Sequence, residues 1–404
     1  MVIGIIGAGA SGMAAAISAS ESANAQVLLF ERQARVGRKL LATGNGRCNL
    51  SNISASLEHY HGDDPSFADK ALQVYSAQET LSWFQDLGLY VVTEPSGRVY
   101  PYSDQANSVV DVLRFALDRT NITLITGAEV QRVRKTDKGF QVDTPECSYT
   151  CDKLIIACGG LAGTKLGGSM SGYKLLRGFG HHSTRLYPAL VQLKSSWNGC
   201  VSLKGVRANC HAQIFERDAL VSEGSGELQF TEYGISGPLV FEISRDACRY
   251  SGNWSCKLDF LPDIDNETLI QWLRSRLKSN QSCEELLTGI LHNRLGRVLC
   301  STVGIRGQMQ ISALSEQDLL RVVQVVKGLE IQLTEPLGMD SAQVTAGGIV
   351  TLEFDPSTME SRLVPGLYAC GEVLDIDGDC GGYNLQWAWS SGRLAGHSAA
   401  SGGK

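Results

Sequence analysis

The sequence predicts an α/β fold that is built by both ends of the chain, with an antiparallel β domain and a small helical subdomain inserted between them. Three observations lead to this class. Residues 1–31 follow a strand–turn–helix–strand pattern, residues 191–241 alternate apolar and polar side chains as antiparallel strands do, and a glycine-rich α/β pattern returns from about residue 343. A chain of 404 residues is long enough for two or three domains.

In the outer parts of the chain, short apolar strands are expected to alternate with helices. A strand is predicted where β-branched and aliphatic residues run together, and a helix where apolar residues recur every three to four positions. The expected strands are residues 2–6, 27–30, 122–125, 154–157 and 366–370, with a hairpin formed by 129–135 and 140–143. The expected helices are residues 13–23, 77–87, 107–119 and 385–400, and a further helical region spans 265–328.

Composition narrows the range of functions. A net charge of -6 argues against a protein whose main role is to bind a nucleic-acid backbone, so a nucleic-acid partner is not expected. No apolar run approaches the ~20 residues that span a bilayer, and residues 1–6 lack the basic region of a secretion signal. We therefore expect a small-molecule substrate, no membrane contact and a cytoplasmic location.

The 12 cysteines are scattered along the chain, and none of them forms a C-x-x-C pair. The nearest approach is that of Cys147 and Cys151, which three residues separate. Zinc sites, iron–sulfur clusters and dithiol redox pairs need tighter groups of cysteines. The sequence therefore predicts no metal site, and reduced thiols are the simplest interpretation.

A G-x-G-x-x-G turn made by Gly7, Gly9 and Gly12 joins the first strand to the first helix. The first glycine permits the tight turn, the second lets a pyrophosphate approach the backbone, and the third allows the helix to pack on the strand. The N-terminus of the helix that follows then turns unpaired N–H groups and a partial positive charge toward the phosphates. This arrangement predicts a bound dinucleotide.

One acidic residue supports the dinucleotide prediction, and a second favours FAD as that dinucleotide. Glu31 ends the second strand, 19 residues past Gly12, where a carboxylate can accept hydrogen bonds from ribose hydroxyls. Gly371 and Glu372 end a short apolar strand near the C-terminus, and large flavoproteins place an acid of this kind against the ribityl chain. The chain has no second G-x-G-x-x-G in a strand–turn–helix context, so any nicotinamide partner must bind without a Rossmann domain of its own.

Further segments carry a more specific signature. They are Lys39 with Thr43-Gly44-Asn45-Gly46-Arg47-Cys48-Asn49, the stretch from Gly226-Glu227-Leu228 through Gly237-Pro238, Thr345-Ala346-Gly347-Gly348, and Gly371-Glu372-Val373-Leu374-Asp375 with Gly381-Gly382-Tyr383-Asn384-Leu385-Gln386-Trp387-Ala388. These segments resemble the BaiN/YhiN-type flavoproteins, members of the glutathione-reductase-like FAD superfamily. The resemblance covers essentially the whole chain.

The resemblance implies a Rossmann-like FAD-binding domain, an inserted β-barrel-like domain and a helical subdomain. It also implies flavin-dependent, NAD(P)H-linked reduction, and steroid-type enones are suggested as substrates for some members. With these domains, the expected boundaries are 1–188 and 341–404 for the FAD-binding domain, 189–262 plus 326–340 for the β domain, and 263–325 for the helical subdomain.

The resemblance and the residue chemistry together nominate the cofactor site. Arg47 is expected to neutralise a phosphate or a substrate carboxylate, Val130 to offer main-chain hydrogen bonds to adenine, and Asn384 to cap the last helix so that its N-terminus faces the flavin. Glu372 stands where the superfamily usually has Asp, and Asp377 is expected to share its role. The predicted cofactor-binding residues are Gly7, Gly9, Ala10, Ser11, Gly12, Glu31, Arg32, Lys39, Thr43, Gly44, Asn45, Gly46, Arg47, Cys48, Val130, Gly159, Gly371, Glu372, Asp377, Gly382, Tyr383, Asn384 and Gln386.

Several alternatives stay open at this level. Cys48 is interpreted as a structural thiol, and His181, His182 and Tyr187 as packing or surface groups, so the sequence names no catalytic acid. The leading function is hydride transfer from FAD to an electron-poor C=C or C=O bond, with NADH or NADPH as a transient donor. A flavin-dependent RNA-modifying enzyme and a non-catalytic flavin-binding sensor are the alternatives. The oligomeric state is not predicted.

Overall fold

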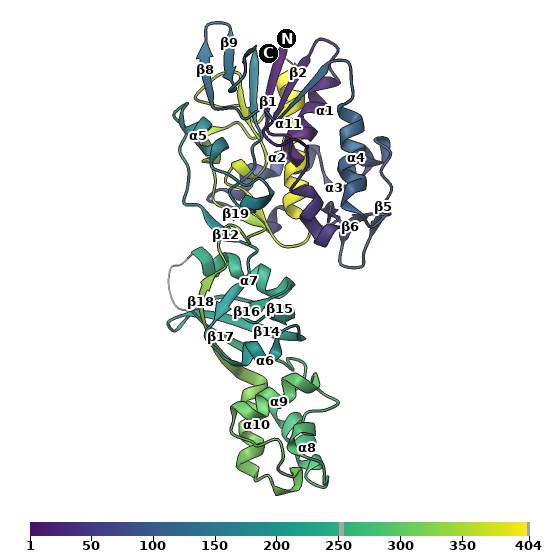
Figure 1. The fold of residues 1–404 in the computed structure, drawn as a ribbon, viewed down its shortest axis with the longest axis vertical. Helices are drawn as coiled ribbons and strands as arrows, with labels where there is room; N and C mark the ends of the chain where they lie inside the picture. Colours follow the sequence, from purple (N-terminus) through teal and green to yellow (C-terminus); the bar gives the residue numbers. More distant parts are fainter. Residues whose placement is uncertain (250–253, 402–404) are drawn as a thin grey trace. The chain divides into compact units, whose positions relative to one another are not determined.

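The structure is a computed structural model that describes residues 1–249 and 254–401. The chain divides into two compact units. The first contains Met1–Tyr187 together with the residues from Gln343 onward, and the second is Pro188–Ala342. The same division is visible in Figure 1, where the purple N-terminal strands and the yellow C-terminal helix lie together. The prediction of an α/β fold completed by both ends of the chain is confirmed.

A five-stranded parallel sheet forms the centre of the first unit. Its strand order is β20-β11-β1-β2-β7, and the register pairs Ile5 of β1 with Leu29 of β2 on one side and with Ile155 of β11 on the other. Both faces of such a sheet are covered, which explains why its strands are almost wholly apolar. The strands are β1 (Val2–Ile6), β2 (Gln26–Glu31), β7 (Ile122–Thr126), β11 (Lys153–Ile156) and β20 (Leu367–Ala369).

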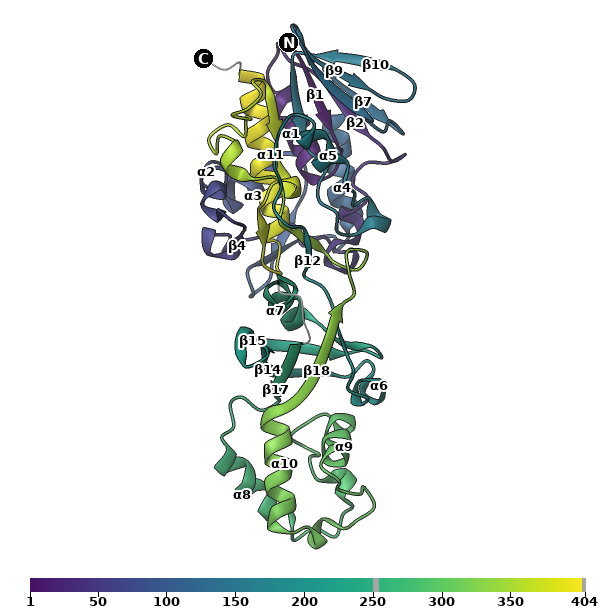
Figure 2. The same ribbon diagram turned by 90° about the vertical axis from the view of Figure 1, so that its left-hand side faces the viewer.

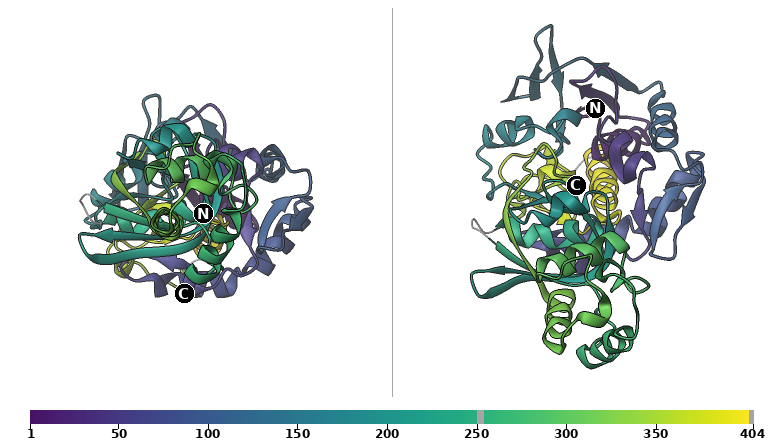
Figure 3. Two further views of the ribbon diagram at one scale, coloured as in Figure 1. Left: turned by 90° about the horizontal axis from the view of Figure 1, so that it is seen from below. Right: turned by 60° about the horizontal axis from the view of Figure 1, so that its bottom comes forward.

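Helices α1 (Ala10–Ser20) and α11 (Tyr383–Ser401) come from opposite ends of the sequence and pack against each other. Figure 3 shows the purple α1 beside the yellow α11. Gly392 and Gly396 make the contact possible, because a Cβ atom at these positions would lie 2.4 and 2.2 Å from backbone oxygens of α1. Since α1 starts at Ala10, the predicted start at residue 13 was three residues late. The turn thus passes directly into the helix.

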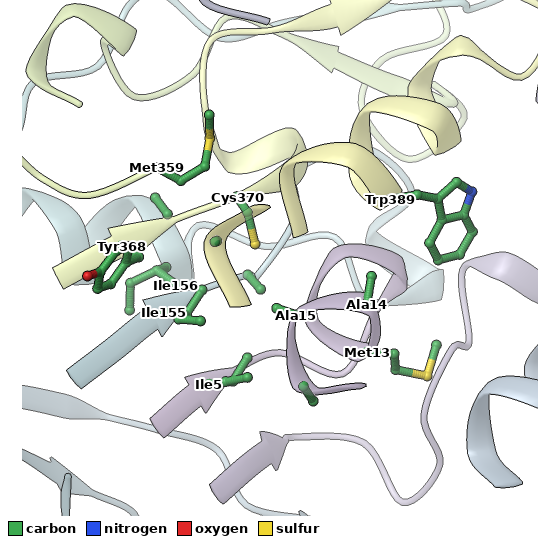
Figure 4. Close-up of a cluster of buried hydrophobic side chains, with 14 of the residues drawn as sticks. Ile5, Met13, Ala14, Ala15, Ile155, Ile156, Met359, Tyr368, Cys370 and Trp389 are labelled. Atoms are coloured by element: carbon green, nitrogen blue, oxygen red, sulfur yellow. The ribbon is translucent and has the colours of Figure 1, made fainter. Parts of the chain in front are cut away.

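The core of the first unit lies between the sheet and these two helices. Figure 4 shows Ile5 and Ile155 on the strands and, farther from them, Met13 of α1 and Trp389 of α11. All four side chains are fully buried. Trp387 is buried as well, so both tryptophans belong to this core.

The remaining elements of the first unit are short. A three-stranded antiparallel sheet of order β10-β9-β8 replaces the predicted two-stranded hairpin, because residues 148–151 add a strand that was not expected. The strands are β3 (Ser51–Asn52), β4 (Tyr60–His61), β5 (Val91–Thr93), β6 (Arg98–Pro101), β8 (Arg132–Thr136), β9 (Gly139–Asp143), β10 (Ser148–Cys151), β12 (Tyr187–Ala189, which runs past the unit's boundary), β19 (Val344–Ala346) and β21 (Asp377–Gly378). The helices are α2 (Asp69–Val74), α3 (Ala77–Asp86), α4 (Ala106–Leu117) and α5 (Ser171–Arg177).

The second unit contains a closed barrel of antiparallel strands in the order β13-β16-β15-β14-β17-β18. Alternation of buried and exposed side chains along β14 and β18 gives the barrel its interior, which explains the alternating pattern in the sequence. The strands are β13 (Leu193–Ser195), β14 (Arg207–Glu216), β15 (Ala219–Phe230), β16 (Gly234–Ser236), β17 (Trp254–Asp259) and β18 (Leu329–Pro336).

Helices α8 (Asn266–Arg276), α9 (Asn293–Thr302) and α10 (Glu316–Gly328) form the helical part of the second unit. In Figure 2, α10 runs directly into the long strand β18. Helices α6 (Gly199–Leu203) and α7 (Pro238–Arg249) accompany the barrel. The separation of barrel and helical part into two domains stays a prediction. Among the described residues, no helix has the length and apolar character that crossing a membrane requires.

Candidate functional site

The three glycines of the N-terminal turn differ in what surrounds them. Gly7 has a φ of +104°, and a Cβ there would lie 2.5 Å from the carbonyl oxygen of Ala157. A Cβ on Gly12 would lie 1.7 Å from the carbonyl oxygen of Gly7, so the helix could not pack so closely with any other residue. A Cβ on Gly9 would meet no protein atom within 4 Å. The open position is the one at which a pyrophosphate is expected to approach the backbone.

Glu31 lies at the mouth of this turn. One carboxylate oxygen accepts a hydrogen bond of 2.9 Å from the N–H of Ala8, and the other accepts one of 2.8 Å from the N–H of Gln33. These two bonds orient the carboxylate, and each oxygen can accept a second hydrogen bond from a ribose hydroxyl. The neighbouring Arg32 instead donates to the carbonyl oxygen of Gly167, which ties this strand end to the loop that follows β11.

Residues 43–48 form a loop that overlaps the end of the short 3₁₀ segment η1 (Leu40–Gly46). Several residues of this loop have a left-handed backbone conformation. Asn45 and Cys48 both have positive φ values, +56° and +62°, which are costly for residues other than glycine. Gly44 and Gly46 share this conformation, and a Cβ on Gly46 would face open space. Such strain is typical of backbone that is shaped for a ligand.

Cys48 is a buried thiol in this loop. Its side chain is inaccessible, and burial raises the pKa of the thiol to about 11, with a hydrogen bond to Thr43 acting weakly in the other direction. A thiol in this state is not a nucleophile at neutral pH. The structure thus supports the interpretation of Cys48 as a structural residue.

The Arg47 guanidinium has protein partners in this structure. It donates to Glu94 at 3.1 Å and to Asp104, and it lies over the Tyr100 ring at 4.0 Å from the ring centroid. The hydrogen bonds that Arg47 donates to Asp104 and Glu94 raise its pKa above the ordinary value. Because two carboxylates already balance its charge, the predicted contact with a phosphate or a substrate carboxylate gains no support.

Lys39 and Glu372, more than 300 residues apart in sequence, form an ion pair of 2.9 Å. The other oxygen of Glu372 accepts a hydrogen bond of 2.9 Å from the N–H of Thr345, whose hydroxyl accepts from the N–H groups of Leu161 and Ala162. The pair and these hydrogen bonds therefore join loops that come from the N-terminal and C-terminal parts of the chain. Each carboxylate oxygen of Glu372 retains capacity for a second hydrogen bond.

The start of α11 departs from the predicted arrangement in two ways. Asn384 is the second residue of the helix rather than its N-cap, and its amide clamps Gly378, accepting from the N–H at 2.8 Å and donating to the carbonyl at 2.6 Å. Gln386 is fully buried and bonds Ser51, Tyr75, Thr80 and Ser390. Gln386 thus has a structural role in place of the predicted cofactor contact.

Other predicted residues lie in loops around the same strand ends. Gly159, with a φ of +69°, follows β11, and a Cβ there would meet no protein atom within 4 Å. Val130 is buried between β7 and β8, and Asp377 is buried in β21. Gly371, with a φ of +75°, passes so close to Ser11 that a Cβ would lie 2.5 Å from its hydroxyl oxygen.

The sequence reasoning missed Asn49 as a site residue. Its amide oxygen is buried and has no hydrogen-bond partner among the described residues, and a Cβ on Gly382 would lie 2.9 Å from it. Buried acceptors are almost always satisfied in folded proteins, so an unpaired one beside this turn indicates a missing donor. The signal was present, since Asn49 ends the same Thr43–Asn49 segment that carries the family resemblance.

Two clusters of histidines around a carboxylate also form in the first unit. Asp379 bridges His59 and His61, with distances of 2.9 and 2.6 Å from its two oxygens to a ring nitrogen of each. Glu353 bridges His181 and His182, which were expected to be packing or surface groups, each at 2.7 Å. The sequence reasoning missed His59, His61 and both carboxylates. The H-x-H spacing at 59–61 was a signal, but the acid partner lies 320 positions from His59.

Comparison with known proteins places the chain in a family. The family model described as HI0933-like protein Rossmann domain matches residues 1–398. The chain belongs to this family. It is 41% identical to the 3-dehydro-bile acid delta(4,6)-reductase of Clostridium scindens, over 98% of both chains. It is 33% identical to a ribosomal RNA dihydrouridine synthase of Escherichia coli, over 96% of this chain and 95% of that one.

A solved flavocytochrome c3 fumarate reductase in an open conformation superposes with a TM-score of 0.48 at 15% identity, over 99% of this chain and 78% of that chain. The family and its relatives make this chain a flavoprotein and an oxidoreductase with a Rossmann-type nucleotide-binding domain. The predictions of family, fold class and enzyme class are thereby confirmed.

The residues present fit a flavin dinucleotide. Open space stands at Gly9, Gly46 and Gly159, where backbone N–H groups or glycine surfaces can approach phosphates and a planar ring. Glu31 is oriented as a ribose acceptor, and Asn49 offers an unpaired buried acceptor to a ring N–H. Among the described residues, no group of three or more His, Cys, Asp or Glu side chains is arranged to hold a metal ion.

Proposed function

We propose that the chain uses FAD and a nicotinamide dinucleotide to reduce a carbon–carbon double bond conjugated to a carbonyl in a small, steroid-like molecule. The observation that carries this proposal is the 41% identity, over 98% of both chains, to a reductase named for 3-dehydro-bile acids and their double bonds at positions 4 and 6. A 3-oxo group beside such bonds forms an extended enone. Its terminal carbon is electron-poor and therefore accepts hydride.

The first unit would hold the cofactor from end to end. The turn at Gly9, together with the start of α1, would bind the pyrophosphate. Glu31 would bind the ribose of the adenosine, and the main chain at Val130 would bind the adenine. The strained 43–48 loop, Asn49 and the backbone from Gly382 would surround the flavin ring. When bound, FAD supplies hydride chemistry that no side chain of the protein can supply.

The ion pair of Lys39 and Glu372 would shape the middle of this site. Because it links η1 to the segment after β20, it holds the two halves of the cradle at a set separation. Arg32 and Asp377 would act beside it, Arg32 by fixing the loop at Gly167 and Asp377 through the ribityl chain.

The electron donor is proposed to be NADH or NADPH that binds transiently, since the sequence has one Rossmann fingerprint and FAD would occupy it. The 12 cysteines all carry free thiols in the structure, and burial raises the pKa of most of them. We therefore propose that the enzyme works in a reducing compartment such as the cytoplasm.

A second candidate substrate is a uridine in ribosomal RNA. The Escherichia coli relative is named for dihydrouridine synthesis, and the reacting C5=C6 bond of uracil is conjugated to the C4 carbonyl, so the chemistry is the same. The net charge of -6 favours the small molecule, because RNA-binding surfaces are generally basic.

The experiment that tests the proposal is anaerobic mixing of the reduced holoenzyme with either substrate. One arm uses a 3-oxo-4,6-diene bile acid, with the saturated 3-oxo compound as its control. The other arm uses a ribosomal RNA transcript, with dihydrouridine measured by mass spectrometry. We expect the diene to oxidise the enzyme rapidly and the saturated compound to leave it reduced. Dihydrouridine in the RNA with no reaction of the diene would favour the second candidate, and no reaction in either arm would refute the proposal.

A further inference from the structure

We propose that His59 and His61, held together by Asp379, are the proton donors of this reduction. The inference rests on the proposed function, because a conjugated double bond takes up a proton as well as a hydride when it is reduced. The residues predicted from the sequence bind cofactor, and none of them was assigned as the acid. Histidine is the side chain best suited to give up a proton near neutral pH.

The geometry leaves each imidazole one ring nitrogen for chemistry. Nδ1 of His59 lies 2.9 Å from Oδ2 of Asp379, and Nε2 of His61 lies 2.6 Å from Oδ1. Within the described residues, Nδ1 of His61 has no hydrogen-bond partner, and Nε2 of His59 has only Glu58 near it, at 3.8 Å. The side chains are 27% and 32% exposed, so protons can be replaced from water.

Backbone contacts attach this cluster to the proposed flavin site. The N–H of Asp379 donates to the carbonyl of His59 at 3.0 Å, and His61 pairs with Asp377 between β4 and β21. The His59 ring stacks on the ring of Tyr383, the first residue of α11, with centroids 4.3 Å apart. The cluster is therefore continuous with the segment proposed to face the flavin ring.

The proton and electron balance is as follows. The nicotinamide dinucleotide is oxidised, and its hydride forms the new C–H bond at the terminal carbon of the conjugated system. The π electrons move toward the carbonyl to give an enolate. The α-carbon then takes a proton from an imidazolium N–H of His59 or His61, and that bond breaks. The neutral imidazole regains its proton from water, so the net change is addition of two hydrogens.

The Asp379 carboxylate stays charged between the two imidazoles. Burial acts to raise the pKa of Asp379, but hydrogen bonds from His61 and His59 outweigh it and hold the pKa below its usual value. The other ionisable groups near the pair are Glu58, Asp63, Asp375, Asp377, Tyr60 and Tyr383. Asp379 is therefore a charged acceptor that fixes the orientation of both rings.

The test measures the two half-reactions of the holoenzyme separately. In His59→Gln, His61→Gln and the double variant, reduction by NADH or NADPH should be unchanged, while oxidation by the 3-oxo-4,6-diene bile acid slows at least about 100-fold in the double variant. The wild-type oxidation rate should depend on pH, and this dependence should flatten in the double variant. His182→Gln, from the other carboxylate-bound pair, is the matched control.

A readout independent of turnover is the NMR spectrum of the imidazole nitrogens in the oxidised holoenzyme. The ring-nitrogen signals of both His59 and His61 should shift in Asp379→Asn, which removes the positioning carboxylate, because one carboxylate accepts from both rings. Equal oxidation rates in wild type and a folded, flavin-loaded double variant would overturn the inference while leaving the proposed function intact. A wild-type enzyme that reduces neither the diene nor RNA would overturn the proposed function, and the inference with it.

Discussion

Two carboxylates of the first unit each bind a pair of histidines, and the two pairs differ in burial and in how many ring nitrogens have hydrogen-bond partners. Both nitrogens of His181 are used, by Glu353 at 2.7 Å and by the Ser361 hydroxyl at 2.9 Å, and its side chain is fully buried against Phe354. Burial lowers the pKa of His181 despite the neighbouring carboxylate. A histidine in this position is part of the packing.

The pair at Asp379 uses one nitrogen of each ring and leaves the other toward solvent or ligand. The same three chemical groups therefore give a structural clamp in one place and a candidate proton relay in the other. Burial and the number of occupied ring nitrogens make the difference, and the residue types alone do not reveal it.

The largest expected contrast is in stability. Glu353→Gln should lower the free energy of unfolding by about 2–4 kcal/mol, because it leaves the buried His181 without its charged partner. Asp379→Asn should lower it by less than about 1 kcal/mol, since its histidines are accessible to water. Urea unfolding of the two variants checks this, and equal losses would break the comparison.

Glu31 extends the comparison to a carboxylate that serves the cofactor. Glu31→Ala should weaken FAD binding by roughly 1.5–3 kcal/mol through loss of charge-assisted hydrogen bonds to the ribose. Flavin that remains bound should react at the wild-type rate. Equilibrium dialysis gives the dissociation constant, with Glu353→Gln as the carboxylate control, and an unchanged value for Glu31→Ala would remove Glu31 from the ribose.

Asp375 is a carboxyl group whose contribution to stability should depend on pH. Burial, with the charges of Asp63 and Asp377 nearby, raises the pKa of this carboxyl to about 6. The folded state then holds a proton that the unfolded chain releases near pH 4, so this group's contribution to stability is present below pH ~4 and is lost as the pH rises through about 6. Asp375→Asn should therefore gain about 1–2 kcal/mol over wild type at pH 7 and lose that advantage at pH 4. Unfolding curves at both values test this, and a difference that does not depend on pH would contradict it.

The smallest effect is expected at His182. Its side chain is 80% exposed, and although Glu353 lies at 2.7 Å, the exposed pair should be worth little. His182→Gln should change stability by less than about 0.5 kcal/mol and leave both half-reactions as they are. A large loss in either measurement would mean that the second pair is not only structural.

The parts of the site that the sequence predicted are those whose partners are local. Gly7, Gly9 and Gly12 sit in one turn, and Glu31 follows at a spacing that a strand–turn–helix–strand unit dictates. The structure bears out this turn and the fold class around it. The positive φ at Gly7 and the close approach at Gly12 are direct consequences of that local pattern.

The parts of the site that could not be predicted depend on hydrogen bonds between residues far apart in the sequence. Gln386 satisfies its amide with Ser51, Tyr75 and Thr80, more than 300 residues earlier, and Asn384 is used for a turn just before its own helix. The same holds for Asp379, whose partners at 59 and 61 come from the other end of the chain. A motif shows which residues gather near the site, but hydrogen-bond satisfaction in the folded unit decides which of them are free to bind.

The central claim is that the first unit, built by both ends of the chain, holds a flavin dinucleotide. Heat denaturation of the purified protein followed by chromatography of the released cofactor tests it most directly. The account predicts FAD at about one equivalent per chain, because the turn at Gly9 and the carboxylate of Glu31 can be filled together only by a dinucleotide. Release of FMN alone, or a colourless protein that FAD does not reconstitute, would contradict it.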